Sequence, residues 1–146
     1  MSRGLIDSTL DKLVSDSQQQ KKIYRFDVTS NTAVSANNLV AWNSGYTSDN
    51  SVYLTSNGKG IKFNKAGRVA VNVHLAGHTG SAGRLWCVLQ GGNYNVQGIT
   101  YGAYSSVDLF AVFEVTTSFE LSVKFIEAFT LCGGGTGPCV FSISYL

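Results

Sequence analysis

The clearest pattern along the chain is an alternation of apolar with small or polar residues at positions 69–76. Side chains of a strand point alternately to its two faces, so a strict period of two predicts a half-buried strand and not a helix. One face carries Asn72 and His74 between two alanines. We expect this face to look toward other subunits, while the opposite face fills the core with Val69, Val71, Val73 and Leu75.

Similar short apolar or alternating runs recur from residue 23 to the end of the sequence, and turn-forming clusters such as Asn43-Ser44-Gly45 and Gly77-His78-Thr79-Gly80 separate them. Short strands at this spacing predict an all-β sandwich or jelly roll. The candidate strands are Ile23–Val28, Leu39–Trp42, Ser51–Leu54, Ile61–Phe63, Val69–Leu75, Leu85–Gln90, Asn95–Thr100, Val107–Val115, Phe119–Ala128 and Cys139–Leu146.

Two of these strands carry apolar residues on both faces. Phe110 and Val112 lie opposite the main apolar face of 107–115, and Ile126 lies opposite that of 119–125. Large apolar residues on a second face indicate contact with a neighbouring subunit. The last strand, 139–146, is expected to be central in its sheet, because an exposed terminal edge would invite aggregation.

Residues 4–22 have a different pattern, a heptad-like seam formed by Ile6, Leu10, Leu13, Ser17 and Gln20. So short a helix is marginal alone in water. Either it is an amphipathic helix folded onto the domain, or it is the end of a longer coiled coil. Polar residues in the seam favour the coiled coil. We therefore expect a coiled-coil stalk end at 1–22 and a β-domain at 23–146.

Composition narrows the function. Charged residues make up 14% of the 146 residues, against about 25% in an average soluble domain. Such a polar but uncharged surface is common in extracellular adhesins and in subunits that bury one another. A net charge of +2, with no basic stripe, argues against nucleic acid. The sequence has no apolar run of membrane-spanning length and no apolar segment typical of a signal peptide.

The three cysteines fit no zinc motif. Cys132 and Cys139 flank a Gly-rich loop and are a candidate disulfide. Cys87 lies in an apolar run, which indicates a buried small hydrophobe.

The stretch 91–104 is the best candidate for a contact surface, because it mixes flat aromatic rings with amides. That mixture suits sugar or protein recognition, although packing in a turn or a subunit interface accounts for it as well. Its candidate ligand- or receptor-binding residues are Asn93, Tyr94, Asn95, Gln97, Tyr101 and Tyr104.

Other polar residues carry weaker signals. Lys59, Lys62, Lys65 and Arg68 form either a solvated turn or an anion-accepting patch for lipopolysaccharide phosphates or a carboxylate held between subunits. His74 is expected to be a hydrogen-bonded interface histidine, or, at a three-fold axis, one of three copies ringing an ion.

The sequence argues against an enzyme. Ser105, Ser106, Asp108 and the two histidines lack a nucleophile-elbow motif. The Gly-rich run 133–138 has no lysine after it and so is no phosphate loop. We expect no metal, cofactor or catalytic residue.

The order of strands and turns from Phe63-Asn64-Lys65-Ala66-Gly67 through Phe119–Phe125 to the terminal Phe141–Leu146 resembles the C1q and tumour-necrosis-factor (TNF) superfamily over residues 23 to 146. That resemblance implies a ten-strand jelly roll. A heptad stalk without Gly-X-Y repeats, leading into such a domain, resembles the tail-needle knobs and fibre tips of short-tailed bacteriophages.

The resemblance implies a homotrimeric, non-enzymatic virion protein at the tail tip, extracellular once released. Its partners would be copies of itself, phage tail components and the host surface, as lipopolysaccharide or an outer-membrane protein. It would plug the tail exit and help to penetrate the host envelope during genome delivery. The alternatives are a bacterial C1q-like adhesion module that binds a protein receptor and, third, an envelope polysaccharide-degrading enzyme.

Overall fold

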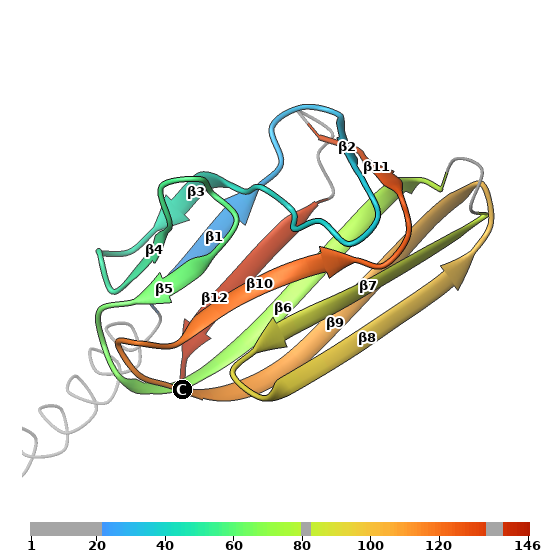
Figure 1. The fold of residues 1–146 in the computed structure, drawn as a ribbon. Helices are drawn as coiled ribbons and strands as arrows, with labels where there is room; N and C mark the ends of the chain where they lie inside the picture. Colours follow the sequence, from blue (N-terminus) through green and yellow to red (C-terminus); the bar gives the residue numbers. More distant parts are fainter. Residues whose placement is uncertain (1–21, 80–82, 134–138) are drawn as a thin grey trace, which may run out of the picture.

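The computed structural model describes residues 22–79, 83–133 and 139–146, and all of its regular elements in these ranges are strands (Figure 1). The predicted all-β class is confirmed. In chain order the strands are β1 (Ile23–Asp27), β2 (Thr32–Val34), β3 (Asn43–Thr47), β4 (Val52–Leu54), β5 (Ile61–Phe63), β6 (Gly67–His78), β7 (Arg84–Gly91), β8 (Tyr94–Tyr101), β9 (Tyr104–Val115), β10 (Glu120–Phe125), β11 (Phe129–Leu131) and β12 (Val140–Tyr145).

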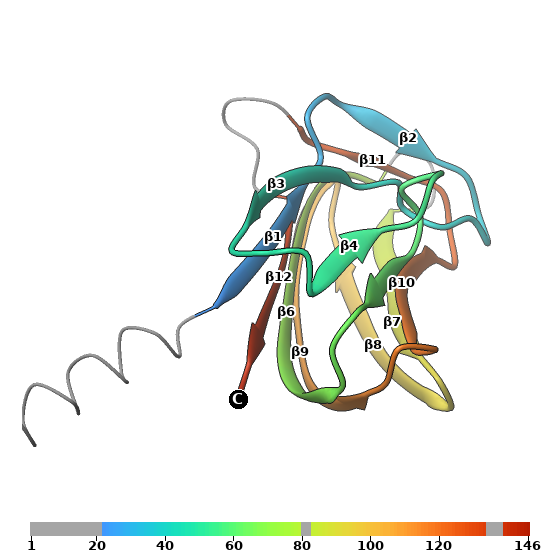
Figure 2. The same cartoon turned by 90° about the vertical axis from the view of Figure 1, so that its left-hand side faces the viewer.

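The strands form two antiparallel sheets that face each other (Figure 2). In the seven-stranded sheet, β6 pairs along its whole length with β9 on one side and with β12 and β11 on the other. β1 and then β3 continue this sheet beyond β12, and β2 lies outside β11. The five-stranded sheet has the order β4-β5-β10-β7-β8. Because β12 lies between β6 and β1, the prediction of a central last strand is confirmed.

The core lies between the sheets. Val69, Val71, Val73 and Leu75 are fully buried, as their alternation predicted. Burying each such side chain contributes about 1.5–3 kcal/mol. Aromatic rings add directional packing, and Trp42 meets Phe141 edge-on with ring centroids 5.4 Å apart. This core fixes which face of each strand is left outside.

Two regions around β3 differ from the sequence expectation. Leu39–Trp42 was predicted as a strand, but it forms only an isolated bridge from Leu39 to Lys124 in β10. Asn43-Ser44-Gly45, predicted as a turn, begins β3, which pairs with β1 and is exposed at every position. An edge strand needs only backbone hydrogen bonds to its single neighbour, so polar residues and Gly do not prevent it.

Two strand ends also differ. β10 ends at Phe125, and the chain then enters β11 of the other sheet, so the expected single strand 119–128 was too long. β6 continues through His78, because β9 and β11 both pair with it there. His74 and His78 are four residues apart in β6 and therefore lie on the same face of the sheet.

Several residues with predicted roles lie outside the described residues. This holds for the seam residues Ile6, Leu10, Leu13, Ser17 and Gln20, and for most of the Gly-rich loop. β1 begins at Ile23, the first position of the predicted β-domain. Among the described residues, no helix is long and apolar enough to cross a membrane.

Candidate interaction surfaces

The outer face of the seven-stranded sheet exposes large apolar side chains in the middle of ordered strands. Phe110 and Val112 of β9 are 63% and 50% exposed, and Ile23 of β1 is 47% exposed. The apolar residues at the other, alternate positions of β9 point inward and pack in the core. The second apolar face predicted for this strand is therefore present, and nothing in the described chain covers it.

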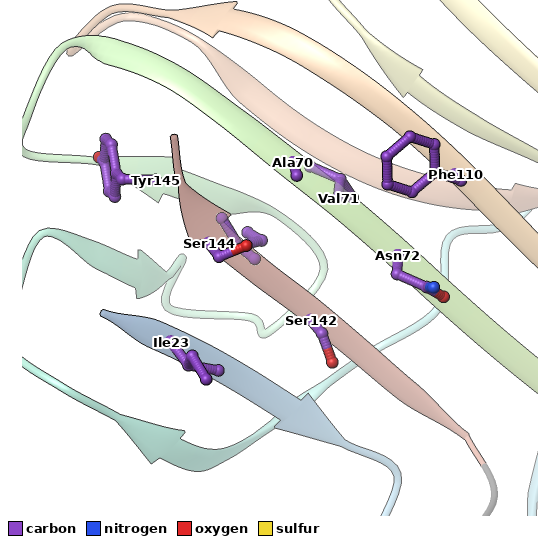
Figure 3. A pocket seen from close by; sticks show the side chains of 9 residues that line it. Ile23, Ala70, Val71, Asn72, Phe110, Ser142, Ser144 and Tyr145 are labelled. Carbon is purple, nitrogen blue, oxygen red and sulfur yellow. The ribbon is translucent and has the colours of Figure 1, made fainter. Parts of the chain in front are cut away.

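A hollow of about 520 Å³ lies between these side chains. Figure 3 shows Ile23 on one side of it, Phe110 on the other, and small residues of β12 and β6 between them. The register explains the shape, because Ser144 stands between Ile23 and Ala70 in one row across the sheet. The small residues at the bottom of this hollow were not predicted from the sequence. The alternation of serine with large apolar residues in β12 indicates them.

Polar pairs surround the hollow. His74 Nδ1 lies 2.8 Å from Asp108 Oδ1, and Arg68 Nε donates to Glu114 Oε1 at 2.9 Å. Exposed pairs of this kind contribute at most about 1 kcal/mol each. Asn72 stands directly opposite Phe110. The structure thus brings together Asn72, His74 and the apolar patch on one face of the sheet.

Ile126 does not join this face. It follows β10 in the other sheet, is half-buried, and donates its backbone N–H to Trp86 O at 2.9 Å. The sequence grouped Ile126 with Phe110 because both break an alternation. The structure shows that the two breaks lie on different sheets.

The residues that could be assembled into a catalytic triad form only a pair. His74 contacts Asp108, but the buried Ser105 directs its hydroxyl to Gly102 O at 3.0 Å. The exposed Ser106 has no hydrogen bond to His74 among the described contacts. No group of histidine, cysteine, aspartate and glutamate in the described residues has the arrangement of a metal site.

The aromatic and amide stretch 91–104 is mostly the strand β8, and its candidate residues separate. Asn95, Gln97 and Tyr101 share the outer face of the five-stranded sheet, with Asn93 in the turn before them. Tyr94 lies instead against β9, beside a hollow lined by Val112 and Phe119. Tyr104 belongs to the other sheet, where its ring packs 4.3 Å from that of His78. The six residues therefore do not make one site.

The four basic residues also separate. Lys62 lies on β5 of one sheet and Arg68 on β6 of the other, where Glu114 pairs with it. The Lys65 ammonium lies 5.0 Å from the centre of the Tyr145 ring, while Lys59 is exposed in the turn before β5. A single anion patch made of all four is not supported.

The cysteines are free thiols, so the candidate Cys132–Cys139 disulfide is absent. The buried Cys139 thiol instead donates to Ala76 O at 3.3 Å and accepts from Ala76 N–H at 3.4 Å. Cys132 donates its backbone N–H to the same carbonyl at 2.9 Å. Cys87 is fully buried, as predicted, and burial raises its pKa to about 12.

Asp49 fixes the start of β1, beside the hollow. Its carboxylate accepts hydrogen bonds from Tyr24 Oη at 2.6 Å, from Ser51 N at 2.8 Å and from Lys22 Nζ at 2.9 Å. These bonds, led by the one from Tyr24, hold the pKa of Asp49 well below its usual range. Burial and the bond to Asp49 raise the pKa of Tyr24 to about 12. The loop that contains Asp49 is thereby tied to the first strand.

The comparisons with known proteins bear on the fold alone. No protein-family model and no curated protein matches the sequence. Among solved structures, murine APRIL at pH 8.0 superposes with a TM-score of 0.69 at 16% identity, covering 86% of this chain and 99% of that one. Eiger TNF from S. frugiperda gives 0.73 at 14% identity, covering 87% and 93%. The fold is a TNF-like jelly roll. The expected architecture is confirmed at that level, with twelve strands in the described residues in place of the ten expected.

Proposed function

We propose that the chain is a homotrimeric, non-enzymatic binding knob assembled through the outer face of the seven-stranded sheet. The observation that carries this proposal is the exposure of Phe110, Val112 and Ile23 around a hollow on an otherwise ordered sheet. Apolar patches of this kind on a folded domain mark interaction surfaces. A second copy of the chain supplies a partner that is always present at the same concentration.

The place where the predicted stalk meets the domain supports a three-fold assembly. The heptad seam ends just before Ile23, and Ile23 is itself one wall of the hollow. A trimeric coiled coil along 1–22 would therefore place the hollows of three copies around one three-fold axis. Residues 1–22 and 23–146 then act as stalk end and knob.

Within this class we place the knob at the tip of a phage tail needle or fibre. Support comes from the combination of a stalk seam without Gly-X-Y repeats and a TNF-like domain. There it would plug the tail exit, contact lipopolysaccharide or an outer-membrane protein, and help to penetrate the envelope during genome delivery. The knob would be part of the virion and extracellular once released.

A C1q-like or TNF-like adhesion module that binds a protein receptor is the second candidate. Its specific support is that the solved structures similar to this chain are APRIL and Eiger TNF. Immunogold electron microscopy with an antibody to the knob distinguishes the two. On virions from a genome that encodes the chain, the tail-tip role predicts gold at the tail end. Unlabelled virions, with the chain on or outside a bacterial cell, would support the adhesion module.

A further inference from the structure

We propose that a polar hollow on the outer face of the five-stranded sheet binds a neutral saccharide unit. The hollow has a volume of about 440 Å³ and lies beside the turn between β7 and β8. Its polar side chains are Gln90, Asn95, Glu120 and Ser122, and Leu39 provides an apolar wall. A volume of this size falls in the range of small-molecule sites.

The sheet register brings these groups together from three strands. Gln90 of β7 stands directly between Asn95 of β8 and Ser122 of β10. Glu120 is two residues before Ser122 and therefore shares its face. The turn that closes the hollow depends on Gly92, whose φ of 56° is in the left-handed region that suits glycine. Rigid strands thus hold the polar row, as a preformed binding site requires.

The hydrogen-bonding groups in this row have defined roles. Gln90 Nε2 donates to Ser122 Oγ at 3.0 Å, so the Gln90 carbonyl is free to accept and the Ser122 hydroxyl is free to donate. The Asn95 side chain adds an amide with both functions. Neighbouring hydroxyls of a sugar ring each donate and accept, so they match a row of alternating donors and acceptors.

Glu120 supplies a stronger acceptor. A Cβ atom on Gly60 would lie 1.8 Å from Glu120 Oε1, so the carboxylate lies over a position that only glycine leaves open. Among the described residues, no hydrogen bond or ion pair is formed by this carboxylate. Hydrogen bonds to a charged acceptor are about twice as strong as neutral ones.

The surroundings favour a neutral ligand over other classes. The negative charge of Glu120 repels an anion. Lys62 is the cross-strand partner of Glu120, and its positive charge weakens the attraction of Glu120 for a cation. The hollow also lacks the cluster of acidic residues or histidines that would hold a metal ion in the described part of the chain. A fully apolar ligand would leave the amides without partners, which costs about 1–3 kcal/mol for each buried group.

This site is on the outer face of the five-stranded sheet, whereas Phe110 is on the outer face of the seven-stranded sheet. Figure 2 shows these two sheets as separate layers. Binding therefore does not require the trimer interface. The inference specifies the chemistry of host-surface contact and rests on the proposed function only for the biological source of the sugar.

The test is an amide NMR titration of the full chain with four methyl glycosides, those of glucose, galactose, rhamnose and N-acetylglucosamine, and with glycerol as the reference polyol. We expect at least one glycoside to shift the backbone amides of Gly91 and Gly92 and the side-chain amide of Asn95, with a dissociation constant of about 1 mM. The Asn95→Ala variant should weaken that binding by about tenfold, which corresponds to 1.4 kcal/mol.

Asn43→Ala, the same change on the edge strand β3 of the other sheet, is the matched control and should bind as the unaltered chain does. The spectra themselves report whether each variant is folded. The proposal is overturned if none of the four glycosides shifts these amides, if glycerol shifts them equally, or if Asn95→Ala binds with unchanged affinity. Light scattering reads the assembly of the same samples separately, so failure of the sugar site and failure of the trimer are distinguishable.

Discussion

Replacing Phe110 by glutamate should separate assembly from folding. The phenyl ring is 63% exposed in the single chain. A phenylalanine side chain buries about 200 Å² when it is covered completely, so a partner copy would cover about 130 Å² more. At about 25 cal/mol per Å², this contributes about 3 kcal/mol per chain to association. The glutamate removes that contribution and places an unpaired charge in the interface, which costs more still.

The same change should have almost no effect on the stability of the isolated domain. Phe110 points outward from β9, and the core residues on either side of it are not changed by the substitution. A substitution at so exposed a position changes the free energy of unfolding by less than about 0.5 kcal/mol. Sedimentation equilibrium at micromolar concentration should therefore find a monomer, with an unfolding midpoint in urea close to that of a dissociated parent chain.

Ile99→Glu is the matched control, because Ile99 is 42% exposed on the outer face of the other sheet. This variant should keep the assembly of the parent chain. A Phe110→Glu protein that assembles as the parent does would refute the assignment of this face to the interface. A Phe110→Glu protein that fails to fold would refute the claim that the side chain serves assembly alone.

Three further predictions concern stability and thiol chemistry. Asp49→Asn should lower the free energy of unfolding by about 2 kcal/mol at pH 7, because a charged acceptor of three hydrogen bonds is lost. Since the folded pKa of Asp49 lies below its ordinary value of 3.8, that stabilisation is present above about pH 4 and is lost as the pH falls. Urea titrations should therefore show the parent and the variant converging in acid, and a constant gap would contradict this. A thiol reagent at pH 8 should modify Cys132 quickly and spare Cys87 and Cys139, whose pKa values burial raises; equal rates at all three would contradict the described burial. Phe141→Ala should cost about 3–5 kcal/mol in chemical unfolding, and a loss below 1 kcal/mol would argue against its central place in the core.

The sequence was most informative where an alternation was strict. The valines of β6 and the two faces of β9 could be assigned before any coordinates, because burial on one side of a sheet imposes a period of two. β3 could not be predicted this way, since an exposed edge strand of polar residues has no apolar face to reveal it. The ends of β6 and β10 depend on pairing with strands distant in the sequence.

The candidate sites were harder to predict because proximity in sequence does not imply a shared face. Asn95 and Tyr94 are neighbours in the chain but point to opposite sides of β8, and Tyr104 belongs to the other sheet. Gln90 and Ser122, in contrast, are far apart in sequence and meet only through the register of β7 and β10. The pattern of a single sequence predicts on which face of its strand a residue lies. Which residues stand beside it on neighbouring strands can be known only from the order and register of the strands.

The proposed function depends first on the assembly of the chain as a homotrimer. Multi-angle light scattering of the purified chain at micromolar concentration tests it most directly, because a chain mass of 15.6 kDa makes the states easy to separate. We expect a particle with the mass of three chains. A particle with the mass of one chain would contradict it.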